Sequence, residues 1–214
     1  MTVFEKPVVM LDFETTGLSP DQGDRITEVA ALRIVDGSIA DRFVSLVNCK
    51  ARLPFFITQL TGITQAMVDS APAVSVVVPA LLRFIGTDAL SAHNAGFDAR
   101  FLLAESRKLG MVPEHNGLIC SLKLSRRIFP GLASYKLATL ASEFGICFKS
   151  AAHRAEADAE VSAKLLLHIA QHLLDTYGFD AINPGLLESV NRLSAIKVPG
   201  FLSKAVLSKE RDQE

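Results

Sequence analysis

Two acidic residues interrupt an apolar stretch near the start of the chain, and they restrict what that stretch can become. Residues 7–14 read PVVMLDFE, a pattern typical of a buried strand, with Asp12 and Glu14 two positions apart. Successive side chains of a strand point to opposite faces, so both carboxylates project to the same side. Two neighbouring anions among apolar side chains repel each other and lose hydration. A divalent cation is the simplest compensation, and carboxylate oxygens suit Mg²⁺ or Mn²⁺.

Three further residues, from distant parts of the chain, could complete such a site. Asp98 follows the letters AHNAGF, and we expect it in the first turn of a helix over residues 96–109. His153 and Asp158 lie in HRAEADAE, and a long helix is predicted from about residue 155 to 177. A lone aspartate in a first helical turn is usually a capping residue near the positive end of the helix dipole. The helical position of Asp98 alone therefore does not identify a metal ligand.

The order and spacing of these residues resemble a known family. DFETTGL occupies residues 12–18, HNAGFD occupies 93–98, and four residues separate His153 from Asp158. Together they resemble the DEDDh family of 3′–5′ exonucleases, and within it the epsilon-type proofreading exonucleases of bacterial DNA polymerase III. The resemblance covers about residues 7–175. It includes LTGIT at 60–64 and ICSLKLSRRIFPGLASYKLATLASEFGI at 119–146.

The expected fold class is α/β. Strands are predicted at 26–35 and 41–48, joined by a turn at Asp36-Gly37, the strongest hairpin signal in the chain. The resemblance implies a ribonuclease H-like fold, in which a mixed five-stranded sheet is flanked by helices. We expect an exonuclease domain over residues 1–178. Residues 179–214 are expected to form a C-terminal extension that is partly helical or loosely ordered, with a loosely held tail at its end.

The resemblance also implies a chemistry with two ions, Mg²⁺ or Mn²⁺. Asp12, Glu14 and Asp158 would hold the ion on the side of the attacking water. Asp12 would bridge to the second ion near Asp98, beside the leaving 3′ oxygen. His153 is the expected general base, because a histidine titrates near neutral pH.

Six other motif residues are expected to bind the terminal nucleotide. Leu18 would act as a wedge against the terminal base, and Ile63 would pack on its other side. The six are Thr15, Leu18, Ile63, His93, Asn94 and Phe97. Leu18, Ile63 and Phe97 could equally be core residues. Glu28, an acidic residue within a predicted strand, could be a structural hydrogen-bonded residue or a neighbour of the metal ligands.

Composition limits the class of protein. A chain of 214 residues with 49% hydrophobic and 21% charged residues is not disordered. Its apolar runs are too short to span a bilayer, so no membrane partner is expected. MTVFEKPVV lacks the pattern of a signal peptide, and three cysteines without paired spacing favour a reducing compartment, so we expect a cytoplasmic protein.

Local charge, rather than net charge, indicates a nucleic-acid partner. The formal net charge is −1. Residues 120–154 nevertheless hold six cations against the single acid Glu143: Lys123, Arg126, Arg127, Lys136, Lys149 and Arg154. Such a segment can contact a phosphate backbone. For any single one of these residues, a solvated helix face is the commoner explanation.

Three functions remain open at this stage. The first is a metal-dependent 3′–5′ exonuclease that acts on single-stranded or frayed 3′ ends of DNA, releases 5′-mononucleotides and could serve proofreading. The second is an RNA exonuclease of the ribonuclease T-like or oligoribonuclease-like kind, since 2′-hydroxyl recognition depends on pocket shape. The third is a non-catalytic interaction module. Whether the protein is freestanding or a DNA polymerase subunit is also open.

Overall fold

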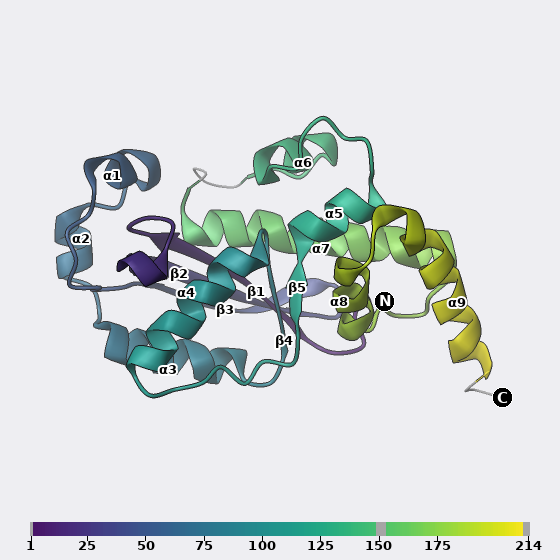
Figure 1. The fold of residues 1–214 in the computed structure, drawn as a ribbon, viewed down its shortest axis with the longest axis horizontal. Coiled ribbons are helices and arrows are strands. Elements are labelled where there is room, and N and C mark those ends of the chain that lie inside the picture. The colour runs from purple at the N-terminus through teal and green to yellow at the C-terminus, as the bar shows by residue number, and fades with distance from the viewer. Residues whose placement is uncertain (1, 149–152, 212–214) are drawn as a thin grey trace.

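A mixed five-stranded sheet forms the centre of the computed structural model, which describes residues 2–148 and 153–211 (Figure 1). The strands are β1 (Val8–Thr15), β2 (Ile26–Val35), β3 (Ser38–Leu46), β4 (Ala89–Ala92) and β5 (Leu118–Cys120). Their order is β3-β2-β1-β4-β5. The β1–β2 and β2–β3 pairs are antiparallel, whereas β1–β4 and β4–β5 are parallel. The predicted fold class is confirmed.

The hairpin between β2 and β3 turns where the sequence predicts it. Asp36 and Gly37 both have positive φ, 49° and 75°. Two left-handed residues match the right-handed twist of the paired strands, which explains the preference for Asp-Gly. The tight turn pairs Val35 directly with Ser38, so β3 begins three residues earlier than expected and ends at Leu46.

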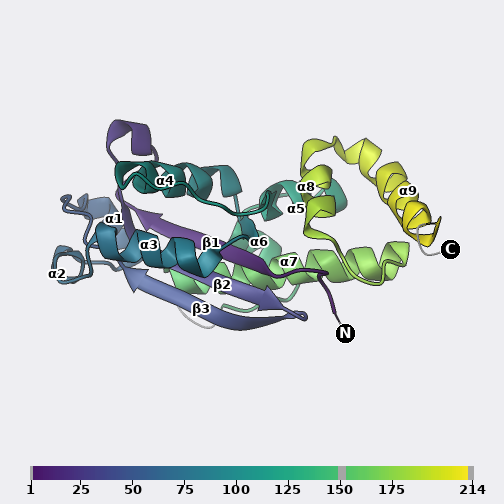
Figure 2. The same cartoon turned by 90° about the horizontal axis from the view of Figure 1, so that it is seen from below.

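Helices cover both faces of the sheet. They are α1 (Phe55–Thr61), α2 (Gln65–Asp69), α3 (Val74–Ile85), α4 (Ala95–Lys108), α5 (Ser121–Ile128), α6 (Leu137–Glu143), α7 (Ala155–Tyr177), α8 (Pro184–Arg192) and α9 (Val198–Arg211), with short 3₁₀ turns η1 (Pro20–Gln22) and η2 (Ala195–Lys197). Helices α3 and α4 lie on one face, and α7 lies on the other (Figure 2). No helix in the described part of the chain is long and apolar enough to cross a membrane.

Strand β1 contributes to both cores by simple alternation. Val9, Leu11 and Phe13 pack toward α3 and α4. Val8 and Met10 pack toward α7. The even-numbered positions of β1 therefore face α7, and the two acidic residues of this strand occupy the next two even positions.

Much of the C-terminal segment packs against the same core. Leu187 of α8 and Leu202 of α9 are fully buried in the cluster that includes Leu173 of α7. Asn191 of α8 accepts a hydrogen bond from the Cys120 backbone N–H at 2.6 Å and donates one to its carbonyl at 3.2 Å. The residues up to Arg211, which include most of the end that we expect to be loosely held, continue α9.

Candidate active site

Two carboxylates stand at the carboxyl end of β1, on the face covered by α7. Asp12 and Glu14 are both half-buried. The register between β1 and β2 shifts between Glu14 and Thr15, so an irregularity in the pairing directly follows the two carboxylates. Pairing with the neighbouring strands thus fixes the backbone of Asp12 and Glu14, while their side chains lie at the carboxyl end of the strand.

A third carboxylate comes from the first turn of α7. Asp158 lies opposite the end of β1, and one oxygen from each of Asp12, Glu14 and Asp158 lies within 4.8 Å of the other two. Carboxylate oxygens this close are suited to a hard divalent cation, because a single ion can contact all three.

The fourth carboxylate approaches from the other face of the sheet. Asp98 is in the first turn of α4 and is only 3% exposed. Its Oδ1 accepts a hydrogen bond from the Phe13 backbone N–H at 3.2 Å, so it lies beside the strand between Asp12 and Glu14. The turn into α4 is made by Asn94, whose φ of 70° is left-handed.

The electrostatics of the cluster favour a bound cation. Burial raises the pKa of Asp12 well above its ordinary value, and the charges of Asp98 and Asp158 raise it further. Burial followed by the Asp158 charge raises the pKa of Glu14 to about 7, and burial raises that of Asp98 to about 8. The pKa of Asp158 is also raised by burial. These residues fit a divalent-metal site, because positive charge would offset a repulsion that otherwise favours protonation.

His153 lies beside the carboxylates. Its side chain is exposed, and its backbone N–H donates a hydrogen bond to Asp158 Oδ2 at 3.2 Å. Its φ of 64° is left-handed, a conformation that histidine tolerates better than most residues. This backbone conformation turns the chain into α7, whose first turn carries Asp158.

A cavity of about 380 Å³ joins these groups to an apolar wall. Its polar side is formed by Asp12, Glu14, Asp158 and His153. Its remaining lining residues are Phe13, Thr15, Gly17, Leu18, Phe56, Ile57, Leu60 and Phe97. Leu18 and Phe56 are 79% and 61% exposed, which is unusual for large apolar side chains at a cavity mouth. The cavity can therefore hold an apolar ring beside a charged group.

Three of the six expected nucleotide-binding residues line this cavity, and three do not. Thr15, Leu18 and Phe97 are part of the lining. Ile63 is fully buried in a separate cluster with Cys49, Leu53 and Val68, so its side chain faces the core of the α1–α2 region. His93 points to a neighbouring cavity, and exposed Asn94 serves as the cap residue of α4.

Sequence reasoning missed the apolar residues of α1 that line the cavity. Phe56, Ile57 and Leu60 occupy the place expected for Ile63. The signal was present in FFITQL, where two adjacent phenylalanines cannot both be buried by one short helix.

Glu28 proves to be a buried hydrogen-bonded residue behind the cluster. It pairs with Glu14 across β1 and β2 and is 2% exposed. Its Oε2 accepts hydrogen bonds from Arg154 Nε at 3.1 Å and from the Ala155 backbone N–H at 3.0 Å. Its Oε1 accepts from Arg154 at 2.5 Å. These contacts hold the start of α7, which carries Asp158, against β2.

Comparison with known proteins agrees with this geometry. The family model described as Exonuclease matches residues 9–166. DNA polymerase III PolC-type of Caldanaerobacter subterraneus subsp. tengcongensis is 39% identical over 169 residues, which are 79% of this chain and 12% of that relative. The DNA polymerase III subunit epsilon of Aquifex aeolicus is 33% identical over 170 residues, which are 79% of this chain and 83% of that relative.

A solved structure gives the same result. Exonuclease X in complex with 5′ overhanging duplex DNA superposes with a TM-score of 0.66 at 27% identity, covering 86% of this chain and 99% of that one. The chain therefore belongs to the exonuclease family, as residues 9–166 show. Within that family its resemblance to the DNA polymerase III proofreading exonucleases is confirmed. Residues 9–166 form an exonuclease domain. This chain spans only a small part of the PolC-type relatives, 11–12% of their length in the first two.

Proposed function

We propose that this protein hydrolyses phosphodiester bonds at the 3′ end of DNA and releases 5′-mononucleotides. The observation that carries the proposal is the convergence of four carboxylates from β1, α4 and α7 beside His153 and an apolar cavity wall. Asp12, Glu14, Asp98 and Asp158 would hold two Mg²⁺ or Mn²⁺ ions. When bound, the ions supply positive charge to the reacting phosphate and to the leaving 3′ oxygen.

The protein's own residues would orient the substrate and move the proton. His153 would accept a proton from the attacking water through its imidazole, which its exposed loop position leaves free to do. Leu18 and Phe56 would hold the terminal base between apolar surfaces at the cavity mouth. The Thr15 hydroxyl donates to the Gly17 carbonyl at 2.6 Å and so holds the turn that presents Leu18.

DNA is favoured over RNA as substrate by the relatives, which are DNA polymerase III proteins, and by the DNA complex of the similar exonuclease. The same relatives favour a proofreading role beside a DNA polymerase. The protein would then act in the cytoplasm, where the three unpaired cysteines, Cys49, Cys120 and Cys147, would stay reduced.

The test compares 3′-labelled single-stranded DNA, duplex DNA with a mismatched 3′ end, and RNA of the same sequence, each with Mg²⁺ or Mn²⁺. We expect mononucleotide release from both DNA substrates, none in excess EDTA, and none from circular single-stranded DNA. Faster release from RNA would move the assignment to an RNA exonuclease. Nicking of the circle would indicate an endonuclease, and binding without turnover would indicate an interaction module.

A further inference from the structure

A second cavity opens beside the active site, at the same edge of the sheet. It has a volume of about 560 Å³, and the side chains that matter here are His93, Leu122, Arg126, Ser134, Tyr135 and Lys136. His93 directly follows β4 and Leu122 is in the first turn of α5, directly after β5, so this cavity lies beyond the carboxyl ends of the two parallel strands. That is the edge at which ligands bind in sheets with parallel strands and flanking helices.

Strand register places this cavity one strand away from the metal carboxylates. Met10 of β1 pairs with Ser91 of β4, so two residues further on Asp12 is level with His93. Adjacent strands are about 4.8 Å apart. A nucleic-acid strand that leaves the active site across the end of β4 would therefore pass directly into the second cavity.

The inner wall of the cavity is fixed and neutral. His93 Nδ1 lies 2.9 Å from Ser121 Oγ, and its Nε2 lies 3.1 Å from the Tyr135 carbonyl oxygen. A carbonyl can only accept, so Nε2 carries the hydrogen and donates it. Burial lowers the pKa of His93 to about 4, which keeps the ring uncharged. This ring ties the segment before α6 to the sheet edge.

The outer rim is positively charged. Arg126 of α5 and Lys136 before α6 are both exposed, and no carboxylate is among the described residues that line the cavity. Neither cation forms an ion pair within residues 2–148 and 153–211. The Arg126 guanidinium lies 5.7 Å from the centroid of the Tyr135 ring. That ring is held in turn, because the Tyr135 hydroxyl donates to the Phe129 carbonyl at 2.8 Å.

We propose that this second cavity binds the phosphodiester backbone of the substrate strand upstream of its 3′-terminal nucleotide, with Arg126 and Lys136 as the phosphate contacts. The proposal rests on the proposed function and deepens it, because it states how the enzyme would hold a strand longer than one nucleotide. Two exposed cations on a neutral, rigid wall complement a polyanion. The cavity begins at His93, one strand away from carboxylates that need bound ions.

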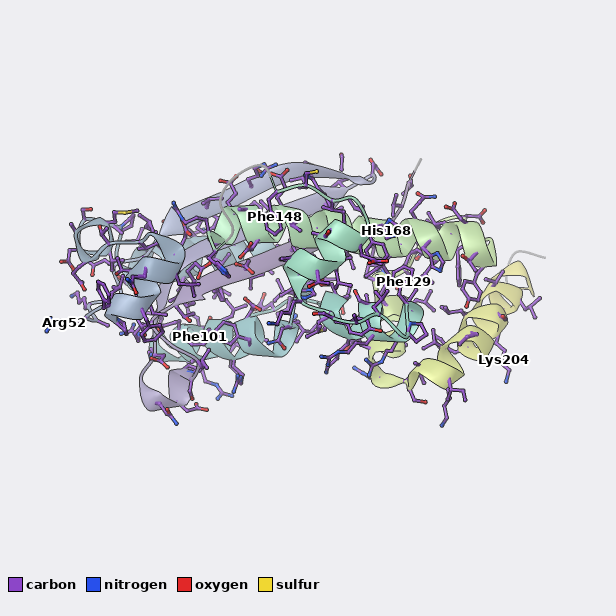
Figure 3. All side chains as sticks on the ribbon, turned by 90° about the horizontal axis from the view of Figure 1, so that it is seen from above. Arg52, Phe101, Phe129, Phe148, His168 and Lys204 are labelled. Atoms are coloured by element: carbon purple, nitrogen blue, oxygen red, sulfur yellow. The ribbon has the colours of Figure 1, made fainter. Side chains whose placement is uncertain are left out.

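Another basic cavity, on the far side of α1, fits a strand less well. It contains Lys50 and Arg52 but also Asp69, so its charge is mixed. Arg52 lies at the extreme end of the molecule, beyond α1 (Figure 3). Lys149, another cation of the predicted basic segment, lies outside the described residues.

The experiment separates strand binding from chemistry. Binding of fluorescein-labelled single-stranded DNA of ten nucleotides is measured by anisotropy with Ca²⁺ at several salt concentrations. Hydrolysis is measured on that oligonucleotide and on thymidine 5′-(4-nitrophenyl phosphate), which has no upstream phosphate. We expect Arg126→Ala and Lys136→Ala each to weaken DNA binding about three- to tenfold. Each should also lower the slope of log affinity against log salt by about 0.7, the value for one single-strand phosphate contact.

Two control variants and the nitrophenyl ester test whether the loss of DNA binding is specific to this cavity. Lys204→Ala on α9, at the opposite end of the molecule from Arg52 in Figure 3, removes the same charge and should change nothing. Arg126→Lys should restore most of the salt slope. Both cavity variants should keep the wild-type rate on the nitrophenyl ester and raise KM only for the oligonucleotide.

Three outcomes would overturn the inference. The first is DNA binding by Arg126→Ala and Lys136→Ala equal to that of Lys204→Ala. The second is a loss of binding that follows Arg52→Ala instead. The third is a loss of hydrolysis of the nitrophenyl ester as large as that of the oligonucleotide, which would place the two cations at the reacting centre. Absence of hydrolysis by the wild-type protein would refute the proposed function, while the binding measurements would still test this cavity.

Discussion

Arg154 donates hydrogen bonds from two nitrogens to the carboxylate of Glu28, and this pair joins the residue after His153 to the strand beside Glu14. Glu28 is almost fully buried, whereas the Arg154 side chain is 40% exposed. The same guanidinium lowers the pKa of Glu14, which burial and neighbouring acids raise. One ion pair thus positions α7 and moderates the repulsion within the carboxylate cluster.

Arg154→Ala should lower both stability and metal affinity. It leaves the Glu28 carboxylate buried with one backbone N–H as its remaining partner. An under-satisfied buried acceptor costs about 1–3 kcal/mol, and the lower half of that range applies here because Arg154 is partly solvated. Mutation of a residue that orients metal ligands typically lowers metal affinity or activity about 10–100-fold.

Urea unfolding and Mn²⁺ titration measure the two effects of Arg154→Ala. Glu28→Gln should be milder, because the amide oxygen still accepts from the Ala155 N–H. Arg192→Ala removes an exposed ion pair with Glu188 and serves as the control. Wild-type Mn²⁺ affinity in Arg154→Ala would show that the pair has no part in positioning the ligands.

Asp12→Asn should abolish activity yet stabilise the metal-free protein. The substitution keeps the shape of the side chain but removes a charge that interacts with Asp98, Asp158 and Glu14. Turnover should fall by orders of magnitude, because a ligand to the ions is lost. Relief of like-charge repulsion should raise the free energy of unfolding in EDTA by on the order of 1 kcal/mol.

Turnover with Mg²⁺ and thermal unfolding at pH 8, with and without Mg²⁺, test whether activity falls while metal-free stability rises. Asp21→Asn, an exposed aspartate of η1, is the matched control and should shift neither quantity. A destabilised Asp12→Asn protein in EDTA would mean that Asp12 has a favourable partner in the metal-free state and that the repulsion argument is wrong.

The metal-free protein should lose stability as pH rises from 6.5 to 9. Glu14 and Asp98 have folded-state pKa values of about 7 and about 8, above the ordinary carboxyl range. The native state therefore keeps protons that the unfolded chain has already released, so unfolding becomes easier as those protons leave. Below pH 6.5 the buried His93 acts in the opposite sense, since its folded pKa is lowered to about 4 and the unfolded chain takes up the proton first.

The affinity for metal should rise with pH over the range in which the stability of the metal-free protein falls. Ions compete with protons for Glu14 and Asp98, so the affinity for Mn²⁺ should rise over the same interval. The stabilisation by Mg²⁺ should consequently be largest near pH 9. Melting temperatures with EDTA and with saturating Mg²⁺ across pH 6.5–9 check both statements. A metal-free melting temperature that rises with pH would contradict the raised pKa values.

Local sequence patterns were sufficient to predict where the strand carboxylates and the hairpin lie. Contacts between residues far apart in the chain could not be predicted in this way. Strand alternation was enough to put Asp12 and Glu14 on one face, and Asp-Gly was enough to locate the hairpin. The contacts of Glu28 lie 126 and 127 residues away in the chain, so no local pattern could reveal that it holds α7.

Residues in one motif can also diverge in space. His93 and Phe97 are four residues apart, yet the turn at Asn94 sends them into two different cavities. Ile63 follows α1 in the chain but packs inward against Val68, because the helix keeps its exposed apolar side for the cavity. A sequence motif therefore locates a neighbourhood of the fold, and packing decides which of its side chains reach the site.

His153→Ala should cut turnover about 10²–10⁴-fold, the usual contribution of a positioned general base, while metal affinity survives. Metal affinity should persist because the contact from His153 to Asp158 is made by the backbone N–H, which alanine retains. The left-handed φ of 64° is less favourable for alanine, so His153→Asn, which tolerates that conformation, is the second variant. His115→Ala removes an imidazole that is hydrogen-bonded to the Gly117 carbonyl in another cavity, and it should leave turnover unchanged.

The pH–rate profile identifies the role of His153. A base must be neutral to accept a proton, so wild-type turnover should fall as the pH is lowered. The His153 variants should lose most of that decline, and the weaker decline left in them should follow the protonation of Glu14 and Asp98. Loss of Mn²⁺ binding in both variants would make His153 a ligand. Full turnover with an unchanged acid limb would mean that another group removes the proton.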